Sequence, residues 1–205
     1  MAPITPYDIT LGYYRKLFVF LLTILKKAST HPDVSTFLTT RIYPDMLPLA
    51  DQILIAVKFP IQLAEAITGK TYPGWRDANK YMWGDDLTTW EGAIARVETV
   101  LDIVTKDTTP DEVNAKLGEG SQLRATLLVE RPGPKAGEQP LVDWETFTLA
   151  TGLPNVFFHA MMVYAILRGK GVDVGKVDVL LPFLPEEEVR GLFERTGREP
   201  FAFVE

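Results

Sequence analysis

Apolar residues recur at steps of three and four in four stretches of the chain, which is the spacing of a helix with one buried face. The predicted helices cover about residues 8–31, 45–69, 88–104 and 155–168. Pro60 lies inside the second stretch and is expected to kink or divide it, while Gly69 is expected to end it. Short antiparallel helices of this kind pack most simply as a four-helix bundle.

The pattern changes between residues 124 and 150. The runs ATLLVE and LVDWETFTL are β-like, and the segment between them, RPGPKAGEQP, contains several prolines and glycines. This predicts a small hairpin at about 124–150 with a long loop. Residues 182–205 form a separate tail with a short amphipathic helix. The predicted organisation is therefore a mainly α-helical domain over 1–181 and a C-terminal extension over 182–205.

Composition excludes several functional classes. The 205 residues carry 27 acidic against 21 basic side chains, a net charge of −6, so a nucleic-acid partner is not expected. The absence of cysteine excludes disulfides, thiolate metal sites and a cysteine nucleophile. The most apolar run, residues 17–25, is too short for a membrane helix, which needs about 20 residues. We therefore expect a buried helix in a soluble, cytoplasmic protein with no membrane partner.

The chain lacks the common cofactor motifs. It contains no phosphate-binding P-loop, no dinucleotide-binding glycine motif after a strand and no G-x-S-x-G nucleophile elbow. The two histidines, His31 and His159, are far apart in sequence, and neither has a second histidine at metal-ligand spacing. We predict no metal and no other cofactor.

His159 is the main candidate for catalysis. It lies within an uncharged apolar segment, on the same helical face as Asn155 and Met162. Burial would lower its pKa and keep the imidazole neutral, so that it could act as a general acid or base. The alternative is a core histidine hydrogen-bonded to a buried partner.

Asp45 is the second catalytic candidate, because it is predicted to start the second helix on the same stripe as Gln52. It would orient His159, while Gln52 and Asn155 would hold a carbonyl or hydroxyl group of a ligand. Alternatively, Asp45 only caps the helix. Arg41 could bind an anionic group, or form a surface ion pair with Asp45.

Aromatic residues supply further candidates for a ligand pocket. Tyr14 and Trp90 lie on predicted core stripes, where packing is the alternative role. Trp75 and Trp83 fall in the turn-rich segment 69–87 and could roof a pocket. The predicted substrate-binding residues are Gln52, Asn155, Arg41, Tyr14, Trp90 and Met162.

Two sequence blocks resemble a known family. TTRIYPDMLPLADQILIA and LPNVFFHAMMVYAILRGKGVDVGKVDVL are similar to the two signature blocks of a bacterial and fungal domain-of-unknown-function family, the nineteen-ninety-three type. The resemblance covers about residues 7–181, without the stretches 69–87 and 182–205. The matching positions are Arg41, Asp45, Met46, Gln52, Asn155, His159, Tyr164 and Arg168.

The resemblance implies a fold related to the DinB/YfiT-like four-helix bundles, many of which bind a divalent metal through three histidines. This chain has one histidine in the matching blocks, so the metal does not transfer. Fungal members accompany genes of secondary metabolism, which implies a small hydrophobic substrate, and related bundles imply a homodimer.

These observations lead to a functional hypothesis with two alternatives. The favoured hypothesis is a cofactor-independent isomerase, cyclase or dehydratase (a lyase) that acts on a largely apolar metabolite. One alternative is a non-catalytic small-molecule-binding or interaction protein. The other is a metal-dependent hydrolase or thiol transferase, against which the histidine count argues.

Overall fold

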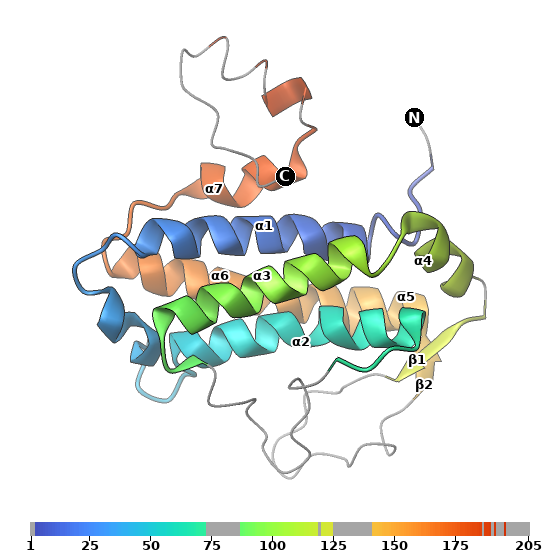
Figure 1. The fold of residues 1–205 in the computed structure, drawn as a ribbon, viewed down its shortest axis with the longest axis horizontal. Helices are drawn as coiled ribbons and strands as arrows, with labels where there is room; N and C mark the ends of the chain where they lie inside the picture. Colours follow the sequence, from blue (N-terminus) through green and yellow to red (C-terminus); the bar gives the residue numbers. More distant parts are fainter. Residues whose placement is uncertain are drawn as a thin grey trace.

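Four helices form the body of the protein (Figure 1). The computed structural model describes residues 3–72, 87–118, 120–124, 141–185, 187–189, 191 and 195. The bundle consists of α1 (Leu11–Ala28), α2 (Leu49–Thr68), α3 (Trp90–Lys106) and α6 (Leu153–Gly169). They pack in the cyclic order α1–α3–α2–α6, so that α6 borders α1 and α2. The predicted mainly α-helical four-helix bundle is confirmed.

Smaller elements connect these helices. They are η1 (Val34–Thr39), α4 (Pro110–Lys116), β1 (Gln122–Arg124), β2 (Leu141–Asp143), α5 (Trp144–Thr146), the π-helical turn η3 (Phe147–Gly152), α7 (Lys176–Leu180) and η4 (Leu181–Phe183). Strands β1 and β2 pair antiparallel, with Leu123 opposite Val142. The predicted small hairpin is therefore present, with β1 directly before the first predicted strand and β2 shorter than the second predicted β run.

The apolar run at residues 17–25 lies within α1 and is buried except at Val19 and Thr23. This confirms the expected core helix. Helix ends also follow the sequence signals: Thr89 caps α3 by accepting a hydrogen bond from the Gly92 amide at 3.0 Å, and Gly69 ends α2 with a φ of 70°.

Helix α2 begins later than predicted, at Leu49 rather than near Asp45. Pro44 and Pro48 explain the difference, because the residue before each proline is disfavoured in helical conformation. The expected division at Pro60 is also wrong, since α2 continues as one helix from Leu49 to Thr68. Pro60 is buried there, so packing against neighbouring helices holds the segment together.

The second predicted β run is mostly helical. Only residues 141–143 form a strand, and Asp143 then caps a helix by accepting a hydrogen bond from the Thr146 amide at 2.7 Å. Elements α5, η3 and α6 follow without a break, so the predicted start of the last helix at Asn155 is too late by about ten residues. The first predicted strand, residues 125–130, lies outside the described residues.

The helical stretch Trp144–Gly169 is also long and apolar enough to cross a membrane, with a mean hydropathy of 1.4. Length and composition alone are weak evidence for a membrane span, because core helices pass the same test. One side of the stretch packs against α1 and α2 within the bundle. A soluble, cytoplasmic protein stays a prediction.

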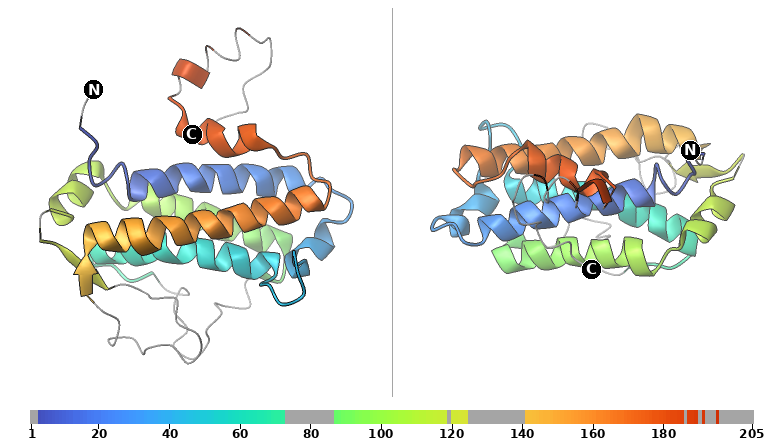
Figure 2. Two further views of the ribbon diagram at one scale, coloured as in Figure 1. Left: turned by 180° about the vertical axis from the view of Figure 1, so that it is seen from behind. Right: turned by 90° about the horizontal axis from the view of Figure 1, so that it is seen from above.

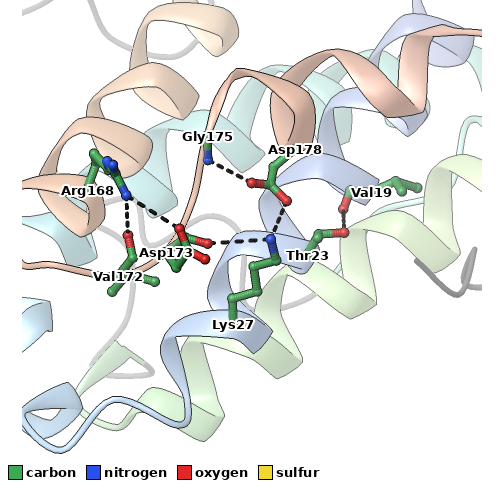
Figure 3. A network of polar contacts seen from close by, with 8 residues as sticks. All are labelled: Val19, Thr23, Lys27, Arg168, Val172, Asp173, Gly175 and Asp178. Carbon is green, nitrogen blue, oxygen red and sulfur yellow. Dashed lines mark hydrogen bonds and ion pairs between the residues drawn. The ribbon is translucent and has the colours of Figure 1, made fainter. Parts of the chain in front are cut away.

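An ion pair between Lys27 and Asp178 connects the segment after α6 to α1 (Figure 3). The Lys27 ammonium lies 2.6 Å from the buried Asp178 carboxylate, whose other oxygen accepts a hydrogen bond from the Gly175 amide at 2.7 Å. The Tyr13 ring also packs against Phe183 at 5.0 Å between centroids. These contacts place α7 and η4 along α1; the domain boundary at 181 stays a prediction.

Candidate functional site

His159 lies on the inner face of α6, where it meets α2. Its side chain is buried, with 7% of the residue exposed, and Asn155 lies one helical turn before it on the same face. The ring of Phe158 packs edge-on against the imidazole, at 5.2 Å between centroids. The imidazole therefore sits at the seam between two helices of the bundle.

The Gln52 side chain fixes the orientation of this imidazole. The Gln52 amide nitrogen donates a hydrogen bond to the Leu47 carbonyl at 3.1 Å, which directs the Gln52 carbonyl oxygen toward His159. That oxygen lies 2.6 Å from His159 Nδ1. Because a carbonyl oxygen can only accept, Nδ1 must carry the proton. The Nε2 nitrogen of the neutral ring then holds a lone pair.

Burial lowers the pKa of His159 to about 4, so the ring is neutral at physiological pH. Gln52 is uncharged and adds no electrostatic stabilisation to an imidazolium, unlike a carboxylate. Nε2 can therefore accept a hydrogen bond from a ligand, or take a proton from an acidic group. It cannot donate a proton until it has first received one.

Other polar groups line the inner face of the same helical stretch. Among the described residues, three buried side-chain oxygens lack a hydrogen-bond partner: Tyr14 Oη, Thr148 Oγ1 and Asn155 Oδ1. Thr148 and Gly152 lie one turn apart in η3, and Asn155 follows at the next turn. A Cβ atom on Gly152 would lie 2.5 Å from the Tyr14 hydroxyl, so this hydroxyl rests against the backbone of Gly152. Buried oxygens without partners are uncommon, and an ordered water molecule or a ligand atom can supply the missing hydrogen bonds.

The sequence predicts Gln52, His159, Asn155 and Tyr14 as candidate site residues, and the structure shows all four buried, with a direct contact between Gln52 and His159. The sequence does not point to Thr148, because the run 141–149 predicts a strand, or to Gly152, because it precedes the predicted start of the last helix at Asn155. Buried positions at Trp144, Phe147 and Thr148 follow the three- and four-residue steps of a helix, which is the signal that could have found them.

Asp45 and Arg41 lie elsewhere. Both are exposed in the turn before α2, where the Arg41 guanidinium donates a hydrogen bond to the Met46 carbonyl. Within the described part of the chain, no hydrogen bond or ion pair joins Asp45 to His159, and Gln52 provides the contact expected of Asp45. A catalytic role for Asp45 and a substrate-binding role for Arg41 stay predictions.

Trp90 makes a structural contact at the far end of α1. Its indole nitrogen donates to the Ser29 hydroxyl at 3.0 Å and to the Leu25 carbonyl at 3.3 Å. Met162 is half-buried and lies at the edge between the inner and outer faces of α6. Trp75 and Trp83 fall outside the described residues.

The described residues do not fit a histidine-based metal centre. They contain no group of three His, Cys, Asp or Glu side chains that could hold a metal ion. His31 Nε2 lies near Gly171, beyond the end of α6, and its Nδ1 accepts a hydrogen bond from the Asp33 amide. At 1.5 Å per residue this is about 18 Å from His159, whereas two zinc ligands each lie about 2.1 Å from the metal.

Comparison with known proteins agrees with this architecture. Residues 7–180 match a family described as "Domain of unknown function (DUF1993)". The chain is similar to the crystal structure of a DinB family member from Shewanella denitrificans, with a TM-score of 0.62 and 25% identity over 85% of this chain and 90% of that chain. No curated protein matches the chain.

Proposed function

Because this chain belongs to the domain-of-unknown-function family DUF1993, which it matches over residues 7–180, we propose a function from its own buried polar site. The proposed function is a cofactor-independent enzyme that isomerises, cyclises or dehydrates a small, largely apolar metabolite. The observation that carries this proposal is the hydrogen bond between Gln52 and His159, which holds a neutral imidazole in one tautomer.

In this proposal His159 Nε2 receives a proton from the substrate. A base with a pKa of about 4 is weak, so it can remove a proton only where the resulting anion is stabilised, as on a carbon next to a carbonyl group that accepts hydrogen bonds. The protonated ring then returns the proton at a second position of the same molecule, which completes an isomerisation. No external acid, base or redox partner is required for this proton transfer.

The unpartnered oxygens supply binding groups for the substrate. Asn155 Oδ1 can accept a hydrogen bond, while the hydroxyl groups of Tyr14 and Thr148 can donate or accept one. Burial raises the pKa of Tyr14, which keeps its hydroxyl protonated and able to donate. Asn155 lies one turn from His159, whereas Thr148 lies eleven residues, about 16 Å, before it along the helical stretch. A substrate that contacts all of these groups must therefore be elongated, with polar groups near both ends of an apolar frame.

The proposal is tested by the variant His159→Gln, with His31→Gln as the matched control. Native mass spectrometry of the purified wild-type protein would identify a co-purified organic molecule. That compound is then incubated with each protein. We expect the wild-type and His31→Gln proteins to convert it, and His159→Gln to bind it while turnover falls by about 100-fold or more, the typical contribution of a general base. Equal turnover by His159→Gln would refute the proposal.

A non-catalytic binding protein is the second candidate. The low pKa of His159 supports it, since a neutral imidazole can offer a ligand the Nε2 lone pair as a hydrogen-bond acceptor without taking up a proton. In that case the co-purified compound would be recovered unchanged from all three proteins. The His159→Gln protein would then bind the compound more weakly than His31→Gln does.

A further inference from the structure

The segment between η1 and α2 is closed into a compact loop over residues 40–49. The Leu49 amide donates a hydrogen bond to the Thr40 carbonyl at 2.9 Å, which joins the two ends of the loop. Inside it, the Met46 amide donates a hydrogen bond to the Tyr43 carbonyl at 3.0 Å and forms a turn. In the view from behind, this loop lies at the end of the bundle where α6 ends (Figure 2). Compact surface loops whose ends are close together are frequently functional.

One carbonyl of the 40–49 loop selects the orientation of the Gln52 amide. The Leu47 carbonyl accepts a hydrogen bond from the Gln52 amide nitrogen at 3.1 Å. The two ends of a glutamine amide have nearly the same shape, but one is a donor and the other an acceptor. Because the Leu47 carbonyl can only accept, it leaves the Gln52 oxygen for His159 Nδ1. Without this carbonyl, the amide could turn over and donate to Nδ1, and the ring proton would then lie on Nε2.

The Leu47 carbonyl is held from both sides along the chain. Pro48 follows it with a φ of −69°, and the proline ring both fixes this angle and restricts Leu47 to extended conformations. On the other side, the Arg41 guanidinium donates a hydrogen bond to the Met46 carbonyl, one peptide unit before that of Leu47. The Arg41 side chain therefore reaches across the loop from its start to the place where Gln52 is anchored.

We propose that Arg41 is a positioning residue of the candidate site, which holds the 46–47 backbone in the place where the Leu47 carbonyl orients Gln52 and so keeps the His159 proton on Nδ1. Three hydrogen bonds form the connection: Arg41 to Met46, Gln52 to Leu47, and His159 to Gln52. A guanidinium suits this role because it is always charged and its planar group has several donors in fixed directions. Hydrogen bonds from charged donors are also stronger than those between neutral groups.

The effect of Arg41 on turnover rests on the proposed function, whereas its effect on the ring proton does not. The proposed reaction needs a lone pair on His159 Nε2, and the Nε2–H tautomer lacks it. A loosened loop would therefore lower kcat and leave KM nearly unchanged. Direct binding of an anionic substrate group by Arg41 would have the opposite signature, because its removal would raise KM and leave the tautomer as it is.

Nitrogen-15 NMR of the histidine rings at pH 7 tests the proposal with the variant Arg41→Ala. We expect the ratio of Nε2–H to Nδ1–H rings at His159 to rise by about fivefold or more, the typical contribution of one hydrogen bond. Arg41→Lys keeps a charged donor for the Met46 carbonyl and should stay close to the wild-type ratio. Arg15→Ala, which removes an exposed arginine from α1, is the matched control and should leave the ratio unchanged.

Kinetics with the co-purified compound provide the second measurement. Arg41→Ala should lower kcat with little change in KM, and Arg41→Lys should restore kcat. Circular dichroism verifies that all three variants are folded. If Arg41→Ala is unfolded, Arg41→Met takes its place, because the methionine side chain retains much of the length of arginine but has no hydrogen-bond donor.

The outcomes separate this proposal from the proposed function. An unchanged tautomer ratio in a folded Arg41→Ala protein would overturn the positioning role, and so would an equal change in Arg15→Ala. A raised KM with an unchanged ratio would also overturn it and would assign Arg41 to direct binding of an anionic group. A shifted ratio together with full turnover by His159→Gln would support the positioning role and refute the proposed function.

Discussion

At the scale of single residues, the function proposed here rests on the protonation state of one imidazole. The Gln52 carbonyl oxygen accepts a hydrogen bond from the Nδ1–H group of His159, and burial disfavours the charged ring. Both effects leave Nε2 as an acceptor at neutral pH. A carboxylate in the place of Gln52 would have favoured the imidazolium instead, so the amide at this position determines the chemistry that is available.

The depressed pKa of His159 predicts a pH-dependent stability. In the unfolded chain the pKa is near 6.5, and in the folded protein it is about 4. Above pH 6.5 the ring is neutral in both states and its full contribution is present. As the pH falls from 6.5 to 4, only the unfolded state takes up the proton, so the free energy of unfolding decreases, by at most about 3 kcal/mol in total.

Urea unfolding of the wild-type and His159→Gln proteins between pH 4 and pH 7 measures this effect. The difference between the two unfolding free energies should shrink as the pH is lowered. His31→Gln should follow the wild-type pH dependence over this range, apart from any contribution of its own ring. Parallel curves for the wild-type and His159→Gln proteins would contradict the assigned pKa.

At the scale of elements, the π-helical turn η3 determines how closely α1 approaches the start of α6. Gly152 ends this turn and faces the Tyr14 hydroxyl of α1, with no space for a Cβ atom. A π turn inserts one extra residue and shifts the residues that follow it around the helix axis. This shift helps to set the face on which Asn155 and His159 lie.

The contact predicts coupled effects of substitution. Gly152→Ala should lower the unfolding free energy by about 1–3 kcal/mol, because the new methyl group would overlap the Tyr14 hydroxyl. Tyr14→Phe removes that hydroxyl, which has no partner, so it should cost little alone and should partly rescue Gly152→Ala. A double-mutant cycle by chemical denaturation measures the coupling. Strictly additive effects would contradict the contact.

The elements also show which features the sequence could predict. The stripe that contains Gln52 and the face that contains Asn155 and His159 follow from helical spacing within each helix. The helix caps at Thr89 and Asp143 are short-range signals of the same kind. The signal at Asp143 lies inside the run 141–149, whose composition predicts a strand instead. The start of α2 at Leu49 could also be predicted from the sequence, because Pro44 and Pro48 disfavour helical conformation in the residues before them.

At the scale of the whole molecule, contacts between distant residues could not be predicted. Gln52 and His159 are separated by 107 positions, and spacing within one helix does not specify which side chain of a neighbouring helix it meets. The chemistry of the side chains favours Asp45 as the partner of His159, but in the structure the Gln52 amide makes this contact. The order α1–α3–α2–α6 determines this choice, since it makes α2 the neighbour of α6.

The same arrangement leaves the outer face of α6 uncovered within one chain. Its sequence is as apolar as a core helix, so composition predicts burial but does not specify the neighbour. The bundle covers one half of the helix and leaves the other half exposed. The exposed apolar face and the candidate site thus share one helix, with His159 on its inner face and Phe157 on its outer face.

The central claim is that His159 is a neutral imidazole protonated on Nδ1. Nitrogen-15 NMR of the histidine rings across a pH titration tests this most directly, with His31→Gln used to assign the signals. We expect a His159 signal pattern of the Nδ1–H tautomer at pH 7, with protonation only near pH 4. An Nε2–H tautomer, or a ring that takes up its proton near pH 6.5, would contradict it.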